Sequence, residues 1–299
     1  KSLKKAARQT IGPELEKRIQ IIIDTGLIEL KDDFKIYWNK FAIGKLTSGK
    51  DYLNPNFELI VDDILEQDQK QKLSSYIERW IKNKINTVLK SLVDLKDLRE
   101  KNSSIKALSY QLYENNGVLK RDQVSEYLKK LGQSERKILR DLGVKFGRYH
   151  VFLHRLIKPE AVSLRTLLWK NFHQKYFNLK PPTFGLNFLN NKDVSNKNFM
   201  LLCGFEKFDS FFVRIDILER LFMKIINSEK KIKIIPEMLN LLGCNKEDFI
   251  KLLKNMGYII IEKESDTFFK YQPKKERKTF SKKTQKESPF EVLKKLSFN

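Results

Sequence analysis

The fold is decided by residues 215–271, which read IDILERLFMKIINSEKKIKIIPEMLNLLGCNKEDFIKLLKNMGYIIIEKESDTFFKY. Apolar residues recur at helical spacing over 215–225, and the β-prone run 231–235 predicts a short strand. A second predicted helix begins at Pro236 and ends at Gly243, because proline suits a first helical turn and glycine suits the residue after the last.

The rest of this stretch predicts a third helix and a hairpin. Asn245 is of the N-cap type, and apolar residues follow at i, i+3, i+4 and i+7 over 249–256. Gly257 ends this helix, and the β-prone runs 258–262 and 267–271 flank a Glu-Ser-Asp turn. A helix, a short strand, two further helices and a terminal hairpin, in this order, predict a winged helix.

Residues 104–154 repeat the same order of elements. Their first predicted helix ends at Asn116-Gly117 and is followed by a short strand, Val118-Leu119. After a second helix, Ser134 is the predicted cap of a third. Residues 144–153 then form the pattern strand, glycine turn, strand, so the sequence predicts a second winged-helix-like module.

Outside these copies the pattern is mainly helical. Pro13 predicts the start of a helix, which ends before Gly26. Residues 34–43 predict a small hairpin. Helical spacing continues over 73–92 and again over 159–172. We therefore expect a mainly α fold with small β-hairpins (α+β), consisting of tandem winged-helix-like modules plus a helical N-terminal region. The expected divisions are 1–100 (helical, with a small hairpin), 101–175 (basic module), 176–211 (connector), 212–272 (winged helix) and 273–299 (basic disordered tail).

Positive charge is concentrated in the middle of the chain. The net charge is +22, of which residues 101–200 carry +12, against +3 for 1–100 and +1 for 201–272. Lysine accounts for 46 of the 59 cations and asparagine occurs 20 times, as an AT-rich genome would produce, which explains part of the total but not its concentration. The middle hundred residues are therefore the expected surface for the phosphates of a nucleic acid.

The candidate contact residues lie within this basic region. Lysine and arginine neutralise phosphates, and an aromatic ring beside a glycine hairpin can stack on a base. The predicted nucleic-acid-binding residues are Lys137, Arg140, Lys145, Arg148, Tyr149, Arg155, Lys158 and Arg165. An alternative stays open, in which Tyr149 and Phe152 pack under the hairpin while the cations are merely solvated. His150 and His154 have no third companion of metal-ligand type, so we expect no metal or cofactor in this chain.

Several classes of chemistry are excluded by missing motifs. The chain has no G-x-x-x-x-G-K-[ST] phosphate loop, no G-x-S-x-G elbow and no H-E-x-x-H pair, so we expect no ATP hydrolysis and no catalytic residues in this segment. Its two cysteines cannot form a disulfide framework, which suits a cytoplasmic protein. No apolar run approaches the roughly 20 residues of a membrane span.

The two ends of the chain suggest a part of a larger protein. The sequence begins at Lys1 without a methionine or a signal peptide. At the other end, lysine-rich residues from 273 onward lead to 288–298, whose apolar spacing predicts a short segment that becomes ordered only on a partner surface.

Five segments together resemble a known family. They are LGVKFGRYHVFLHRLIKPEA (142–161), LRTLLW (164–169), FVRIDILERL (212–221), PEMLNLLGC (236–244) and SPFEVLKKL (288–296). In this order they resemble the C-terminal accessory region of alphaproteobacterial ATP-dependent helicases, relatives of the mitochondrial degradosome helicase, a Suv-type member of the DExH superfamily 2 class. None of these segments carries a catalytic motif.

The resemblance implies a helicase whose two RecA-like motor domains, with their ATP and Mg²⁺, precede this chain. We expect the chain to bind and guide single-stranded RNA or DNA as a non-catalytic accessory region, with the motor domains and a nuclease or other protein at the tail as partners. Two alternatives remain: a protein-interaction scaffold and a winged-helix DNA-binding regulator. The regulator predicts a basic third helix, where Glu247 and Asp248 instead offset the lysines.

Overall fold

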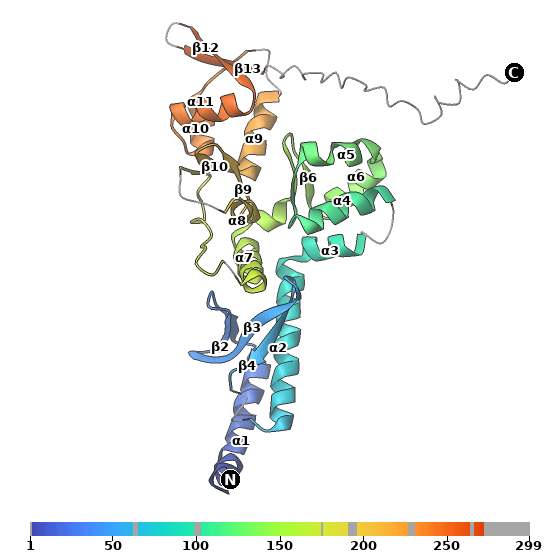
Figure 1. The fold of residues 1–299 in the computed structure, drawn as a ribbon, viewed down its shortest axis with the longest axis vertical. Helices are drawn as coiled ribbons and strands as arrows, with labels where there is room; N and C mark the ends of the chain where they lie inside the picture. Colours follow the sequence, from blue (N-terminus) through green and yellow to red (C-terminus); the bar gives the residue numbers. More distant parts are fainter. Residues whose placement is uncertain are drawn as a thin grey trace, which may run out of the picture.

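The fold class is α+β, with helices and small antiparallel sheets (Figure 1), as predicted. The structure is a computed structural model that describes residues 2–61, 65–98, 103–174, 176–190, 196–226, 231–263 and 266–271. The expected basic tail and its docking segment lie outside these residues.

The N-terminal part contains two helices and a sheet. Helix α1 (Ser2–Thr25) lies beside α2 (Gln67–Val88), and between them in sequence a meander of four strands pairs in the order β1-β2-β3-β4. The strands are β1 (Ile28–Leu30), β2 (Lys35–Trp38), β3 (Phe41–Asp51) and β4 (Asn54–Leu59). The predicted hairpin is thus part of a larger sheet, and Asn39 turns it with a φ of 52°.

The predicted helix start at Pro13 is wrong. Helix α1 runs through this residue, since the fixed φ of proline is compatible with a helix. The proline removes one backbone hydrogen bond and its ring crowds the carbonyl four residues earlier, a cost of about 3 kcal/mol that the rest of the helix must offset. Gln69 of α2 donates its side-chain amide to the Gly12 carbonyl at 3.1 Å, which ties α1 to α2 at this point.

The long helical pattern over 73–92 forms two helices. The buried residues of α2 recur every four positions from Gln69 to Ile85, and the helix ends with Leu89 as its C-cap. Helix α3 (Lys90–Leu98) follows in a new direction (Figure 1). The change of direction brings α3 against α4 (Ser103–Glu114), the first helix of the next unit.

Residues 103–153, called the first unit below, follow the predicted order of elements. They form α4 (Ser103–Glu114), β5 (Val118–Lys120), η1 (Arg121–Val124), α5 (Ser125–Lys130), α6 (Gln133–Asp141), β6 (Val144–Phe146) and β7 (His150–Leu153), with sheet order β5-β7-β6. Ser134 does not cap α6. Gly132 occupies the N-cap, and the Glu135 carboxylate accepts its backbone N–H at 2.9 Å, so the reciprocal half of a capping box replaces the serine cap.

The expected connector over 176–211 contains structure of its own. After η2 (His154–Ile157) and the mostly buried α7 (Pro159–His173), a small sheet pairs in the order β8-β10-β9. The strands are β8 (Phe188–Leu189), β9 (Phe205–Phe208) and β10 (Phe211–Arg214), and helix α8 (Lys197–Leu202) lies between β8 and β9 in sequence. Aromatic side chains such as Phe199 and Phe205 give this segment a core, which a count of its asparagines and lysines conceals.

Residues 215–271, the second unit, have the predicted elements. They form α9 (Ile215–Ile226), β11 (Ile232–Lys233), α10 (Pro236–Leu242), α11 (Lys246–Asn255), β12 (Tyr258–Lys263) and β13 (Asp266–Tyr271), with sheet order β11-β13-β12. The predicted cap is confirmed, since the Asn245 side chain accepts the Asp248 backbone N–H at 2.7 Å.

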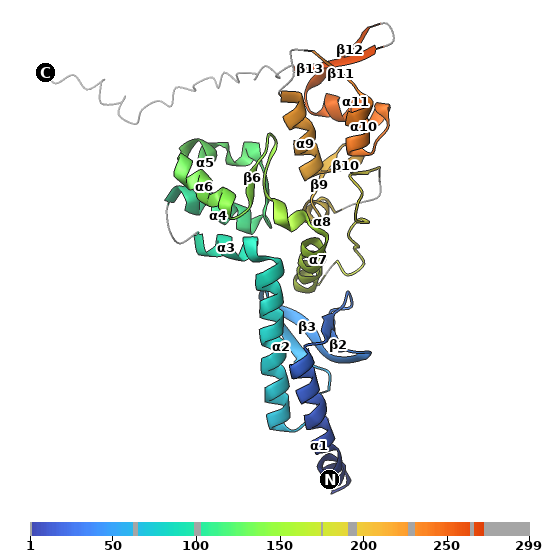
Figure 2. The same cartoon turned by 180° about the vertical axis from the view of Figure 1, so that it is seen from behind.

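The two views agree on how these parts are arranged. Helices α1 and α2 extend to one end of the molecule, and the two units lie side by side at the other end. Helix α7 lies between the N-terminal sheet and α8 (Figures 1 and 2). One hydrophobic cluster runs from Ile19 to Leu168, so the predicted regions 1–100 and 101–175 share a core. The second unit has a separate core, formed around Phe222 and Phe249.

Candidate nucleic-acid interface

Six of the eight predicted contact residues are exposed cations on the first unit and on the segment that follows it. This set, called the basic surface below, consists of Lys137, Arg140, Lys145, Arg148, Arg155 and Lys158. Among the residues that the structure describes, none of the six forms an ion pair. Arg148 lies over the ring of Tyr271, 6.0 Å from its centroid, but none of the six charges is neutralised by a carboxylate of the described residues.

Backbone hydrogen bonds bring the middle of this surface together. Gly143 donates to the Arg140 carbonyl at 2.8 Å and accepts from His154 at 3.3 Å, which joins the end of α6 to the start of η2. Lys145 lies on the edge strand β6 between two inward-facing residues, so its side chain points away from the core.

Arg165 was predicted to contact nucleic acid, and this prediction is wrong. Its side chain is completely buried in α7. Nη1 donates to the Asn116 carbonyl at 2.7 Å, and Nη2 donates to the Leu156 carbonyl at 3.0 Å and to the Leu202 carbonyl. Burial lowers the pKa of Arg165 to about 10. Arg165 therefore joins three chain segments and has no surface to offer a phosphate.

Tyr149 is not available for base stacking either. Its ring packs edge-on against Phe222 of α9, with the ring centroids 4.6 Å apart, and burial raises the pKa of its phenol. The hairpin between β6 and β7 thus docks on the second unit. The alternative that Tyr149 is a packing residue is correct, although its partners lie on another unit and not beneath its own hairpin.

A single carboxylate holds this hairpin. Glu219 of α9 accepts the backbone N–H groups of Arg148, of Tyr149 at 2.9 Å and of His150 at 2.8 Å. A Cβ at Gly147 would collide with the Glu219 carboxyl group, so only glycine permits this close approach. Three consecutive N–H groups pointing at one carboxylate form an anion-binding nest, here occupied by the protein itself.

His150 lies between two buried carboxylates. Its Nδ1 is 3.2 Å from Glu219 Oε1 and its Nε2 is 3.4 Å from Glu206 Oε2, and Lys120 Nζ is 2.6 Å from the other oxygen of Glu206. Only the imidazolium form can donate from both ring nitrogens at once. Burial lowers the pKa of His150, but hydrogen bonds to Glu206 and Glu219 outweigh it and leave the pKa above its ordinary value.

The sequence contained one signal for this junction, which the motif search missed. Glu219 is four residues after Ile215 and three before Phe222, so it occupies the apolar stripe of its own helix. A carboxylate at such a position must have a buried partner. Glu206 gives no comparable signal, because it lies in a short strand whose pairing depends on tertiary structure.

We expect the stability of this junction to depend on pH. The pKa of His150 is raised above 6.5 in the folded protein. Its contribution to the free energy of unfolding is therefore complete below about pH 6.5 and is lost as the pH rises through the raised pKa. Hydrogen bonds to His150 and Lys120 outweigh burial and lower the pKa of Glu206, so its contribution is lost at the opposite, acidic end. Urea unfolding midpoints of wild type should therefore decrease between pH 6.5 and pH 9, whereas His150→Gln should lack this step. Parallel profiles would contradict the assignment.

Comparison with protein-family models, with curated proteins and with solved structures finds no match to this chain. Over the described ranges, none of the helices has both the length and the apolar character needed to cross a bilayer.

Proposed function

We propose that this chain is a nucleic-acid-binding accessory region that guides a single strand of RNA or DNA. The observation that carries the proposal is the basic surface, six exposed cations without an ion pair among the described residues. Residues 137–158 contain all six cations and a single acidic residue, Asp141. Such a local excess of positive charge favours a polyanion.

The architecture supports this function. We propose that both units are winged helices, because each contains a helix, a strand, two helices and a hairpin, with the last strand in the middle of its sheet. In such modules the third helix is a common contact element for nucleic acid. In the first unit this helix is α6, which carries Lys137 and Arg140.

Within this proposal, the parent protein is an ATP-dependent helicase. The support is the resemblance of the five quoted segments to the accessory region of Suv-type helicases. The chemistry of ATP and Mg²⁺ would belong to the motor domains, and the residues described here would supply grip on the strand.

A role in binding other proteins is the second candidate, and two observations favour it. The hairpin of the first unit, which in a winged helix can contact nucleic acid, is used here to bind the second unit through Glu219. On α11 of the second unit, Lys251 pairs with Asp248 at 3.2 Å, which reduces the charge available to nucleic acid. Such a scaffold would bind single strands no better than any basic protein.

We expect the variant Lys137→Ala/Arg140→Ala/Lys145→Ala/Arg155→Ala to lose most of its affinity for single-stranded RNA or DNA. Each lost phosphate contact should reduce the slope of log affinity against log salt by about 0.7, so four contacts should reduce it by about 3. Fluorescence anisotropy with a labelled oligonucleotide at several salt concentrations measures both quantities.

A matched control removes four exposed lysines of the second unit, Lys246, Lys254, Lys263 and Lys270. Its net charge is the same as that of the test variant. If both variants lose affinity equally, binding follows net charge alone and the basic surface is not the site. If neither loses affinity while both stay folded, the scaffold role is favoured.

A further inference from the structure

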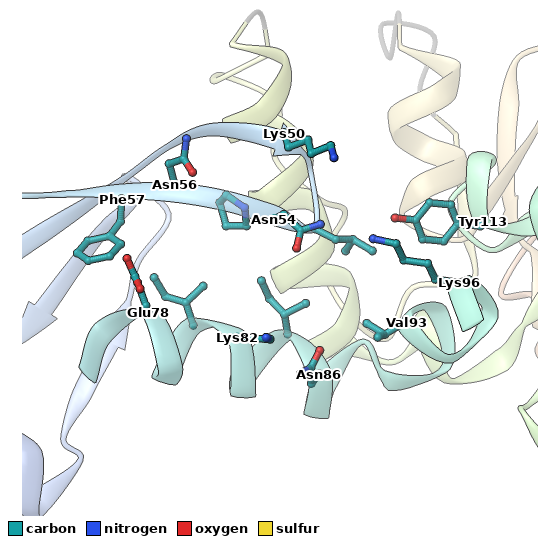
Figure 3. Close-up of a pocket in the computed structure, with 14 residues that line it drawn as sticks. Lys50, Asn54, Asn56, Phe57, Glu78, Lys82, Asn86, Val93, Lys96 and Tyr113 are labelled. Carbon is teal, nitrogen blue, oxygen red and sulfur yellow. The ribbon is translucent and has the colours of Figure 1, made fainter. Parts of the chain in front are cut away.

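A cavity of about 360 Å³ lies between the end of the β3–β4 hairpin, α2, α3 and Tyr113 of α4 (Figure 3). Its size is within the range of small-molecule sites. Its floor is apolar, with Leu53, Ile81 and Ile85 among the lining residues, and its remaining wall is mostly cationic and amide. It does not overlap the basic surface.

The hairpin end that forms one wall is held in a defined position. Asp51 accepts the backbone N–H of Leu53 at 2.9 Å and the side-chain amide of Asn54 at 2.8 Å. A Cβ at Gly49 would collide with the Asn54 carbonyl, so glycine lets the two strands approach where the β3–β4 pairing is irregular. These contacts fix the backbone beside Lys50.

Three lysines line the cavity, one from each of three elements. Lys50 comes from β3, Lys82 from α2 and the half-buried Lys96 from α3, and within the described part of the chain none of them forms an ion pair. Of the described residues that line the cavity, Glu78 alone is acidic, and it lies at the end with Phe57, whereas Lys96 lies at the end with Tyr113 (Figure 3).

This distribution of charge favours a particular ligand. Three ammonium groups around one small cavity repel one another, so a bound anion is stabilised by each of them. A phosphate monoester carries about two negative charges near pH 7, more than the single charge of a phosphodiester. The apolar floor offers a surface for a base, and Asn86, whose side chain makes no hydrogen bond to the described residues, lines the cavity as an additional polar group.

We propose that this cavity binds the phosphate monoester of a nucleotide, with the phosphate near Lys50 and Lys96 and the base over the apolar floor. A free nucleoside monophosphate and the 5′-phosphorylated end of a single strand share this chemistry. The proposal adds a site to the proposed function and does not depend on the basic surface.

The test compares matched oligonucleotides that differ only in a 5′-phosphate or a 5′-hydroxyl group. Because charge-assisted hydrogen bonds to the terminal phosphate exist in only one of them, we expect the phosphorylated strand to bind about tenfold more tightly. This preference should disappear in Lys50→Ala/Lys96→Ala. It should persist in Lys40→Ala/Lys90→Ala, a control that removes two exposed lysines outside the cavity, and in the variant of the basic surface.

Equal affinity of wild type for the two strands would overturn the proposal, and so would a preference that survives in Lys50→Ala/Lys96→Ala. Competition by inorganic phosphate as strong as that by nucleoside monophosphate would also overturn it, because the base would then contribute nothing.

Competition by a nucleoside monophosphate identifies which of the two ligands the cavity binds. Full competition at equal concentration indicates the free nucleotide, and competition only in large excess indicates the end of a strand. Failure of the basic-surface variant to lose affinity would affect only the proposed function.

Discussion

Replacing Glu219 by Ala is expected to lower the free energy of unfolding by about 3–5 kcal/mol, the size typical of removing one partner from a buried ionic contact. The Glu219 side chain is 7% exposed. Its removal would leave the N–H groups of Arg148, Tyr149 and His150 without their acceptor, and would leave the imidazolium with one carboxylate. Each unsatisfied buried donor contributes to the loss.

Chemical denaturation followed by circular dichroism measures this loss. Glu219→Gln keeps the shape of the side chain and one acceptor oxygen, so it should lie between wild type and Ala and remains measurable if the Ala variant does not fold. Glu262→Ala, which removes an exposed carboxylate from β12, is the matched control and should change stability by less than about 0.5 kcal/mol. A loss below about 1 kcal/mol for Glu219→Ala would show that the hairpin is not held by this carboxylate.

Replacing Arg165 by Ala should destabilise the protein by about 3 kcal/mol. The guanidinium connects the turn after α4, the end of η2 and the end of α8 through their carbonyl oxygens. Loss of these charge-assisted hydrogen bonds and the cavity left beside α7 both destabilise the folded state. Together they outweigh the desolvation cost that is saved when the buried charge is removed. Arg165→Lys keeps the charge but cannot reach three carbonyls with the same fork, so we expect an intermediate loss.

The matched control is Arg155→Ala, an exposed arginine a few residues earlier. The two variants should affect different properties. Arg155→Ala should weaken nucleic-acid binding at constant stability, whereas Arg165→Ala should lower the unfolding midpoint. If Arg165→Ala weakens binding while stability is unchanged, Arg165 contacts nucleic acid after all, and the buried position described above is not the functional one.

Local order could be predicted because it depends on neighbours in the sequence. The spacing of apolar residues in 215–271, with Asn245 as a cap and Gly243 and Gly257 in the positive-φ region, defines the helices of the second unit. Where two local signals competed, the prediction failed. Pro13 can begin a helix or lie inside one. A hydrogen bond from Gln69 to the preceding residue, Gly12, 57 positions earlier in the chain, accompanies the second choice.

The candidate site could be predicted only in part, because the sequence determined which residues carry charge but not their surroundings. Lys145 and Arg165 are both cations in one basic region, yet one projects from an edge strand and the other lies fully buried among three carbonyls. Tyr149 and His150 follow a glycine turn that was predicted correctly, but their partner Glu219 is about 70 residues away along the chain. Exposure and pairing over such separations depend on how whole elements pack, and only the tertiary structure decided them.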